Sequence, residues 1–301
     1  MNFLTKKSLQ VNKRGVVRRR NSGWTVYSPQ SQIKHPVLMF RIMVRDLLAS
    51  RELAWRLFIR DINAQYRQSA LGFFWAVVPA IVTAIGFTLA KNNGIVNIGE
   101  TDLPYPAYVL FSTTLWQTFI ESLNAPIQAV GAAKAMLAKI NFPREAIVLS
   151  QLGQVGFNFG IKLILIIGMF IWFKMPVTWS AIIAPVALIH LVIFGTAIGL
   201  FLAPIAALYQ DIGRFLVIVI GTWLFLTPVV YPVPTAGMLR KIVSLNPVTP
   251  LLVTTRELAT TGVISNPSGF WLVSIVAMVG LLLSWIFYRQ AMPYVVERIS
   301  S

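Results

Sequence analysis

Long stretches without charged side chains dominate this sequence and constrain its fold more than any other feature. Hydrophobic residues make up 56% of the chain and charged residues only 12%, about half the share found in a soluble domain. A helix of about 20 such residues can cross the hydrocarbon core of a bilayer. Six windows qualify, the third interrupted only by Lys162: residues 68–90, 103–120, 146–173, 175–210, 212–231 and 268–288. This pattern predicts an all-α membrane protein with six transmembrane helices.

Basic residues are divided unevenly between the two sides that such a topology defines. Residues 1–70 hold fourteen Lys and Arg against three acids, and their side of the membrane collects twenty basic residues against five on the other. The positive-inside rule therefore places both termini in the cytoplasm. Attraction to anionic lipid accounts for the net charge of +16, and no recognition module points to nucleic acid as a partner. No apolar stretch follows the basic N-terminus closely, so we expect no cleaved signal peptide.

Residues 51–67 have the periodicity of an amphipathic helix that lies at the membrane surface. Aromatic and aliphatic side chains gather on one side of the helical wheel and arginines on another. We expect this cytoplasmic interface helix to continue without a break into the first span at residues 68–72 and to transmit movement to it. A plain anchor that only sets topology is the alternative. The residues expected to act here are Trp55, Arg56, Ile59, Arg60, Tyr66 and Arg67.

Residues 232–267 are apolar but too interrupted by prolines and charges to span a membrane. We expect re-entrant external helices between spans five and six, which are tolerated where they pack on protein or line a water-filled cavity. An ordinary external loop is the alternative. Candidates for an external gate are Arg240, Lys241 and Arg256 in this segment, with Asn92, Asn93 and Tyr105 on the link between the first two spans.

Four regions follow from these patterns. They are a basic cytoplasmic segment over residues 1–50, the interface helix over 51–67, a six-span domain over 68–290 and a cytoplasmic tail over 291–301. Two small-xxx-small steps, Gly156 to Gly160 and Gly195 to Gly199, permit close helix packing within one subunit or between two.

Three ionisable residues in or beside the expected spans form a short list of candidate functional residues, because charge is costly there. Glu121 lies near the cytoplasmic half of the second span and Lys162 in the middle of the third, so the two could pair across neighbouring helices. A structural ion pair is one interpretation and a proton relay the other, but a relay needs several acids. His190, alone on its span, is more often a satisfied interior histidine than a ligand.

The residue patterns needed for catalysis or metal binding are missing from the sequence. There is no cysteine, and with only His35 and His190 we expect no metal site. The ten acidic residues are scattered, which argues against a membrane-embedded glycosyltransferase. The phosphate-binding pattern G-x-x-x-x-G-K-[ST] is also absent, so active transport would need energy from a partner. The sequence therefore predicts a chain that is not an enzyme and that holds no cofactor; the role of a transport subunit is implied by the resemblance described next.

Several separated stretches carry a resemblance to one family. They are "RDINAQYRQSALGFFWAVVP" (60–79), "AKINFPREAIVLSQL" (138–152), "ALYQDIGRFLVIVIGTWLFLTPVVYP" (207–232), "LNPVTPLLVTTRELATTG" (245–262) and "YRQAMPYVVERIS" (288–300). In this order the sequence resembles the permease subunit of type-2 ABC exporters for polysaccharide, such as O-antigen (lipopolysaccharide), capsule or teichoic acid. The resemblance covers residues 50–300. It implies a homodimer in the bacterial inner membrane that binds separate ATPase subunits, which hold ATP and Mg, and exports a lipid-linked polysaccharide.

The cytoplasmic link "KAMLAKINFPRE" matches the position of the family's coupling helix, which inserts into a cleft of the ATPase. The alternative is that its cations only obey the positive-inside rule. The residues that we expect to couple to the ATPase are Lys134, Lys139, Phe142, Pro143, Arg144 and Glu145.

Aromatic side chains in the spans are candidates to line a sugar-conducting channel, because aromatic faces stack on pyranose rings with modest, sliding affinity. Some of them must instead face lipid or form an interfacial belt. The candidates are Phe73, Phe74, Trp75, Trp116, Phe119, Phe215, Trp223 and Phe225. Two other functions remain open: export of a small molecule or lipid by the same fold, and a membrane component of polysaccharide assembly.

Overall fold

The computed structural model describes residues 36–67, 72–140, 142–175 and 177–300, and these ranges contain helices but no β-strand. Most of the predicted basic N-terminal segment, residues 1–35, lies outside them. The chain divides into two compact units, Met1–Met43 and Val44–Ser301. In the first unit the described residues form the start of helix α1 (Pro36–Ala49). The described residues form an all-α fold, as the sequence predicts, and most of its helices belong to the second unit.

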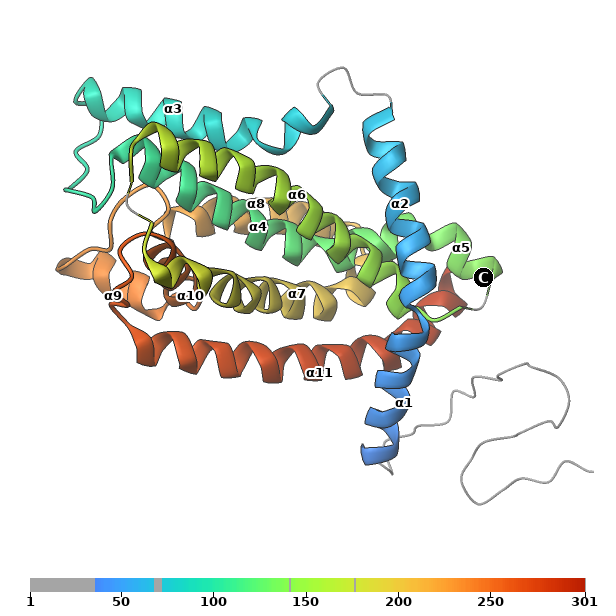
Figure 1. The fold of residues 1–301 in the computed structure, drawn as a ribbon. Helices are drawn as coiled ribbons and strands as arrows, with labels where there is room; N and C mark the ends of the chain where they lie inside the picture. The colour runs from blue at the N-terminus through green and yellow to red at the C-terminus, as the bar shows by residue number, and fades with distance from the viewer. Residues whose placement is uncertain (1–35, 68–71, 141, 176, 301) are drawn as a thin grey trace, which may run out of the picture. The chain divides into compact units, whose positions relative to one another are not determined.

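Helix α2 (Arg51–Arg67) has the bounds predicted for the interface helix. Residues 68–71, where it is expected to pass into the first span, lie outside the described residues, but the part that follows is not a continuous helix, so the prediction of an unbroken helix is wrong. Gly72 has a φ of 47°, in the left-handed region that an α-helix excludes, and it begins the 3₁₀ turn η2 (Gly72–Ala76). Helix α3 (Val78–Asn92) then starts anew with a proline in its first turn. Figure 1 shows α2 crossing the direction of α3 steeply.

A long helix lies in each of the other five predicted windows: α4 (Tyr105–Ala132), α6 (Glu145–Trp172), α7 (Ala184–Leu208), α8 (Asp211–Phe225) and α11 (Pro267–Ser300). In α6, α7 and α11 the helix is both long and apolar enough to cross a membrane, and α3 is a shorter apolar helix. Helix α4 extends well past the predicted end at residue 120, because the charge of Glu121 ends the uncharged window but does not end a helix. The protein is therefore membrane-embedded, with three clear candidate spans.

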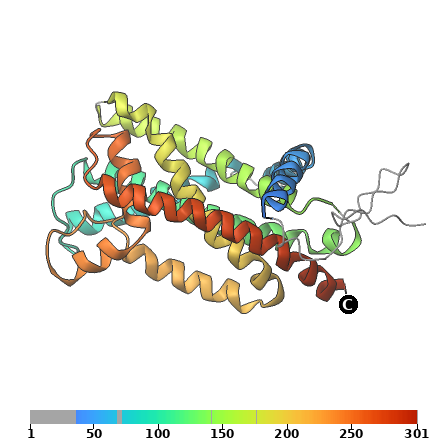
Figure 2. The ribbon, with the colours of Figure 1, turned by 90° about the horizontal axis from the view of Figure 1, so that it is seen from below.

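The long helices run alongside one another (Figures 1 and 2). Helices α2, α5 (Lys134–Lys139) and the C-terminal part of α11 lie at one end of this bundle, which we call the α5 end. Helices α9 (Gly237–Leu245) and α10 (Val248–Ala259) lie at the other, which we call the α9 end.

Helix α7 lies at the centre of the packing, against α4, α10 and α11. Its two glycines bring the α4 backbone close: a Cβ on Gly195 would lie 2.8 Å from the Phe119 carbonyl oxygen, and one on Gly199 would overlap the Leu123 carbonyl. By contrast, Gly156 has no atom within 4 Å of the position that a Cβ would take. The Gly195 to Gly199 step therefore serves packing within one chain.

The proline-broken segment after α8 forms helices, as predicted, and is not an ordinary loop. Helix α10 is almost wholly buried against α4, α7 and α11. Asn246 joins it to the end of α8: its side-chain oxygen accepts from Trp223 Nε1 at 2.9 Å, and its amide nitrogen donates to Thr227 Oγ1 at 2.8 Å. Packing on protein is the condition under which such irregular backbone is tolerated at membrane depth.

Candidate functional site

Helix α6 carries a row of polar side chains along one face of an otherwise apolar helix. Gln151, Gln154, Asn158 and Lys162 are spaced by three or four residues, which places them on one stripe. Sequence reasoning singled out only Lys162. The spacing of the three amides was visible in the sequence and is the signal that could have added them.

The Lys162 side chain is completely buried and forms an ion pair with Glu121 of α4. The pairing expected from the sequence is therefore confirmed. Glu121 keeps 30% of its side chain exposed, and its second oxygen lies 3.5 Å from the Asn158 amide nitrogen. A buried ammonium without a carboxylate partner would be very costly, so the ion pair with Glu121 offsets the cost of burying Lys162 within the bundle.

Tyr66, near the end of α2, joins this network from outside the bundle. Its hydroxyl donates to the Asn158 side-chain oxygen at 3.1 Å. Partial burial, and secondarily the negative charge of Glu121, raise the pKa of Tyr66. The phenol therefore stays protonated at physiological pH and remains a donor. A continuous polar chain, Tyr66 to Asn158 to Glu121 to Lys162, links α2, α6 and α4.

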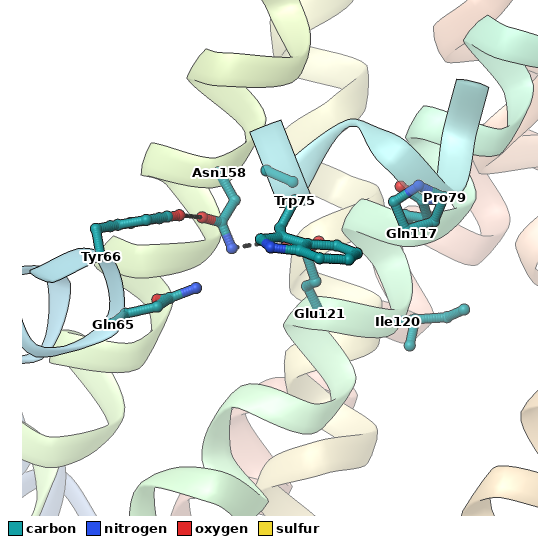
Figure 3. A pocket seen from close by; sticks show the side chains of 9 residues that line it. Gln65, Tyr66, Trp75, Pro79, Gln117, Ile120, Glu121 and Asn158 are labelled. Atoms are coloured by element: carbon teal, nitrogen blue, oxygen red, sulfur yellow. Dashed lines mark hydrogen bonds between the residues drawn. The ribbon is translucent and has the colours of Figure 1, made fainter. Parts of the chain in front are cut away.

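A cavity of about 320 Å³ lies beside this chain, between α2, η2, the start of α3, α4 and α6. Figure 3 shows Gln65 and Tyr66 reaching from α2 toward Asn158 and Glu121. The remaining lining residues are Trp75, Ala76, Pro79, Gln117 and Ile120. Nothing in this arrangement resembles a nucleophile with its base; the groups can donate and accept hydrogen bonds and offer an aromatic surface.

The other predicted interface-helix residues divide between two exposed faces of α2. Trp55 and Ile59 are exposed apolar side chains on one face, and Arg56, Arg60 and Arg67 are exposed on another. The face packed against α6 holds different residues, with Ala54 and Leu57 fully buried. Periodicity found the helix, whereas the buried face depends on where α6 lies.

At the α5 end, three charged side chains that are distant in sequence meet. Arg289 of α11 forms ion pairs with Asp46 of α1 and with Glu145 at the start of α6, the latter at 3.4 Å. The neighbouring Tyr288 hydroxyl donates to the Arg144 carbonyl oxygen at 3.3 Å. Sequence reasoning named Arg144 and Glu145 but not the groups that hold them.

The remaining predicted coupling residues surround this cluster. Lys139 of α5 is exposed, and Lys134, Phe142 and Pro143 are partly buried. Helix α5 packs against α11 and the end of α4. A force on α5 therefore reaches two of the long helices directly.

The predicted channel aromatics also divide by exposure. Trp116 and Phe119 are buried, and with Trp223 and Phe194 they form a ring cluster with centroids 5.4–6.3 Å apart. The other five predicted residues are 50–62% exposed: Phe73, Phe74, Trp75, Phe215 and Phe225. Among the predicted channel aromatics, this second group is the exposed one within a single chain, although the Phe73 ring still packs on Tyr66 and Phe157.

The predicted external-gate residues lie in unlike surroundings. Arg256 is 5% exposed, donates to Ser112 Oγ at 2.9 Å and lies 4.2 Å from the centre of the Tyr108 ring. Arg240 and Lys241 are exposed on α9. At this end Tyr105 donates to the Val230 carbonyl at 2.9 Å, while Asn92 and Asn93 lie at the end of α3.

His190 packs edge-on against Phe270 and Trp271, and its Nδ1 lies 2.8 Å from the Val186 carbonyl oxygen. Its Nδ1 and its ring thus have partners, but the side chain is only partly buried. No group of three or more potential metal ligands occurs among the described residues.

Comparison with known proteins places these features in one context. A family model described as ABC-2 type transporter matches residues 52–260, a range that includes the pocket, α5 and α10. The chain is 27% identical over 199 residues to the O-antigen export system permease protein RfbA of Myxococcus xanthus, covering 64% of this chain and 73% of that protein. It is 26% identical over 235 residues to RfbA of Klebsiella pneumoniae, with 75% and 85% covered.

Proposed function

Because this chain belongs to the ABC-2 type transporter family, we propose that it is a permease subunit that exports an O-antigen-type polysaccharide. The observation that carries the proposal is the similarity to permeases named for O-antigen export, which extends over 73–85% of their length. The mostly apolar exterior of α6, α7 and α11 and the absence of a phosphate-binding motif agree with a membrane subunit that performs no ATP chemistry itself.

The proposal includes the topology predicted from the sequence. Six spans, with both termini in the cytoplasm of the bacterial inner membrane, would place the α5 end on the cytoplasmic side. The excess of Lys and Arg in the segments at that end supports this orientation.

The proposal also includes two copies of the chain and a separate ATPase, which would bind ATP and Mg. Helix α5 is the docking element that we propose, because Lys139 and Ile140 are exposed on it and just after it. Phe142→Asp, or charge reversal at both Lys134 and Lys139, should abolish co-purification with the ATPase and stop export. Unchanged association and export would rule out docking at α5.

Deletion of the gene tests the function. Lipid-linked polysaccharide should accumulate inside the cell while the surface is bare, and a plasmid copy should restore the surface polymer. Loss of polymer from both places would favour a role in assembly. Normal polymer in both places would leave export of a small molecule or lipid as the better reading.

A further inference from the structure

The pocket beside the Glu121–Lys162 pair has the composition of a ligand site. Its size, about 320 Å³, falls at the lower end of the range of small-molecule pockets. The wall combines an aromatic ring with five polar side chains from three helices: Trp75, Gln65, Tyr66, Gln117, Glu121 and Asn158. Trp75 is 57% exposed, so most of its ring is free to contact a ligand.

Two amides of this wall are free for a ligand. Within the part of the chain that the structure describes, neither Gln65 nor Gln117 has a hydrogen-bonding partner in the protein. Each primary amide offers two donors and an acceptor, and the exposed part of the Glu121 carboxylate accepts further bonds. The pocket thus presents donors and acceptors together, which suits a ligand bearing several hydroxyl groups.

The charges of the lining residues favour a sugar over a phosphate as the ligand. Among the residues that the structure describes, the lining includes no Lys or Arg, and the nearby ammonium of Lys162 is completely buried against Glu121. A phosphate would therefore meet a carboxylate with no exposed cation to pair with, whereas the strong sites for phosphate use Arg or Lys. Neutral hydroxyl groups carry no such penalty.

We propose that this pocket binds one neutral sugar ring of the exported polysaccharide, with Trp75 against its C–H face and Gln65, Gln117 and Glu121 on its hydroxyl groups. The negative face of the indole attracts the weakly positive C–H groups of the ring. The identity of the ligand rests on the proposed function, whereas the pocket and its chemistry do not. Because Gln65 and Tyr66 belong to α2 and the other polar side chains of the wall to α4 and α6, a movement of α2 would open or close the site.

Ligand binding to the purified full-length permease tests the proposal. The probes are methyl glycosides of mannose, galactose, rhamnose and N-acetylglucosamine, observed by saturation-transfer NMR. The detergent should be lauryldimethylamine oxide, because maltoside detergents carry sugars of their own. At least one glycoside should bind with millimolar affinity, and inorganic pyrophosphate should not displace it.

Two variants should weaken that binding about tenfold, since each removes one contact. They are Trp75→Leu and Gln117→Leu, neither of which leaves a buried polar group without its partner. Trp172→Leu is the matched control, because this exposed tryptophan lies at the other end of α6, and its binding should equal that of the unaltered protein. Absence of glycoside binding, equal binding by all three variants, or displacement by pyrophosphate would each overturn the proposal.

An export assay separates this inference from the proposed function. If deletion of the gene stops export but Trp75→Leu and Gln117→Leu together leave export normal, the chain is a permease and the pocket inference fails. If deletion leaves export unchanged while the glycosides bind and the variants do not, the pocket inference survives and the proposed function fails.

Discussion

Two largely buried arginines, one at each end of the bundle, are stabilised by different kinds of contact. Arg289 at the α5 end is shared by two nearly buried carboxylates, those of Asp46 and Glu145. Arg256 at the α9 end forms no salt bridge with any described residue and lies over the Tyr108 ring instead. The first arrangement depends on balancing charges, whereas the second depends on neutral acceptors and an aromatic face.

The two arginines therefore differ in how easily their contacts can rearrange: the contacts of Arg289 can be lost when helices move, whereas those of Arg256 hold two helices in a fixed position. Arg289 connects three helices beside α5, and an ion pair can exchange its partners for water when helices move. Arg256 attaches α10 to α4 through Ser112, and the Pro228 carbonyl lies 3.4 Å from its guanidinium. We infer that the α5 end is the more adjustable of the two.

The largest effect should come from Arg289→Met. The substitution leaves the two nearly buried carboxylates with no cation except the exposed Arg45, which lies 3.8 Å from Asp46, and we expect a loss of about 3–5 kcal/mol of stability. The midpoint of heat-induced unfolding in detergent measures it. The control is Arg214→Met, whose ion pair with Asp211 is 84% and 92% exposed and should contribute almost nothing. Equal midpoints for the two variants would refute the charge-balance account.

A triple variant that should recover the lost stability makes this test more specific. Adding Asp46→Asn and Glu145→Gln to Arg289→Met removes the charges of these three side chains and leaves only the exposed Arg45 beside them. Because a neutral cluster leaves no uncompensated buried charge, most of the lost stability should return. A triple variant that unfolds as easily as Arg289→Met would show that packing, and not charge, explains the loss.

Arg256→Met should cost less, about 2 kcal/mol. The change removes a desolvated cation–π contact and hydrogen bonds to neutral groups, but it leaves no buried charge behind. The same unfolding midpoint measures it, with Arg240→Met on exposed α9 as the control. A loss as large as that of Arg289→Met would break the comparison between the two ends.

Lys162→Met should have a smaller effect, about 1 kcal/mol, because Glu121 keeps contact with water through the pocket. The double variant with Glu121→Gln should be close to the unaltered protein in its unfolding midpoint. If the single variant fails to accumulate in the membrane while the double variant does, Glu121 is less hydrated than its 30% exposure indicates.

Arg56→Ala should have the smallest effect, about 0.3 kcal/mol. Its pair with Glu52 is an i,i+4 contact with both side chains about three-quarters exposed. The unfolding midpoint of the isolated permease should hardly change. A clear drop in that midpoint would mean that the arginine face of α2 is covered by something other than solvent.

Much of the fold was predictable because a membrane helix needs a long uncharged window and an interface helix needs a periodic one. The bounds of α2 and the helices in all six windows follow from those local requirements, whereas the Glu121–Lys162 pair was suggested by the cost of a lone charge within a span. The pocket was less predictable. Asn158 and Gln117 are ordinary polar residues in sequence, and only the approach of α2 to α6 gives them a common cavity.

The helix break at Gly72 could not be predicted from the local sequence pattern. A glycine in an apolar run is compatible with a helix or a turn, and its positive φ is set by the steep crossing of α2 over the bundle. Similarly, nothing in the sequence near Asp46 or Glu145 points to Arg289, because the three meet only after α1, α6 and α11 have packed.

A helical membrane protein without its own phosphate-binding motif could be predicted from the amino-acid order, because hydrophobicity, charge and motifs are properties of single segments of the chain. Only the packing of the helices shows which polar side chains share a pocket, which aromatic rings are exposed and which arginine contacts carboxylates. Those outcomes depend on contacts between helices that are up to 243 residues apart in the chain, and no local pattern encodes them.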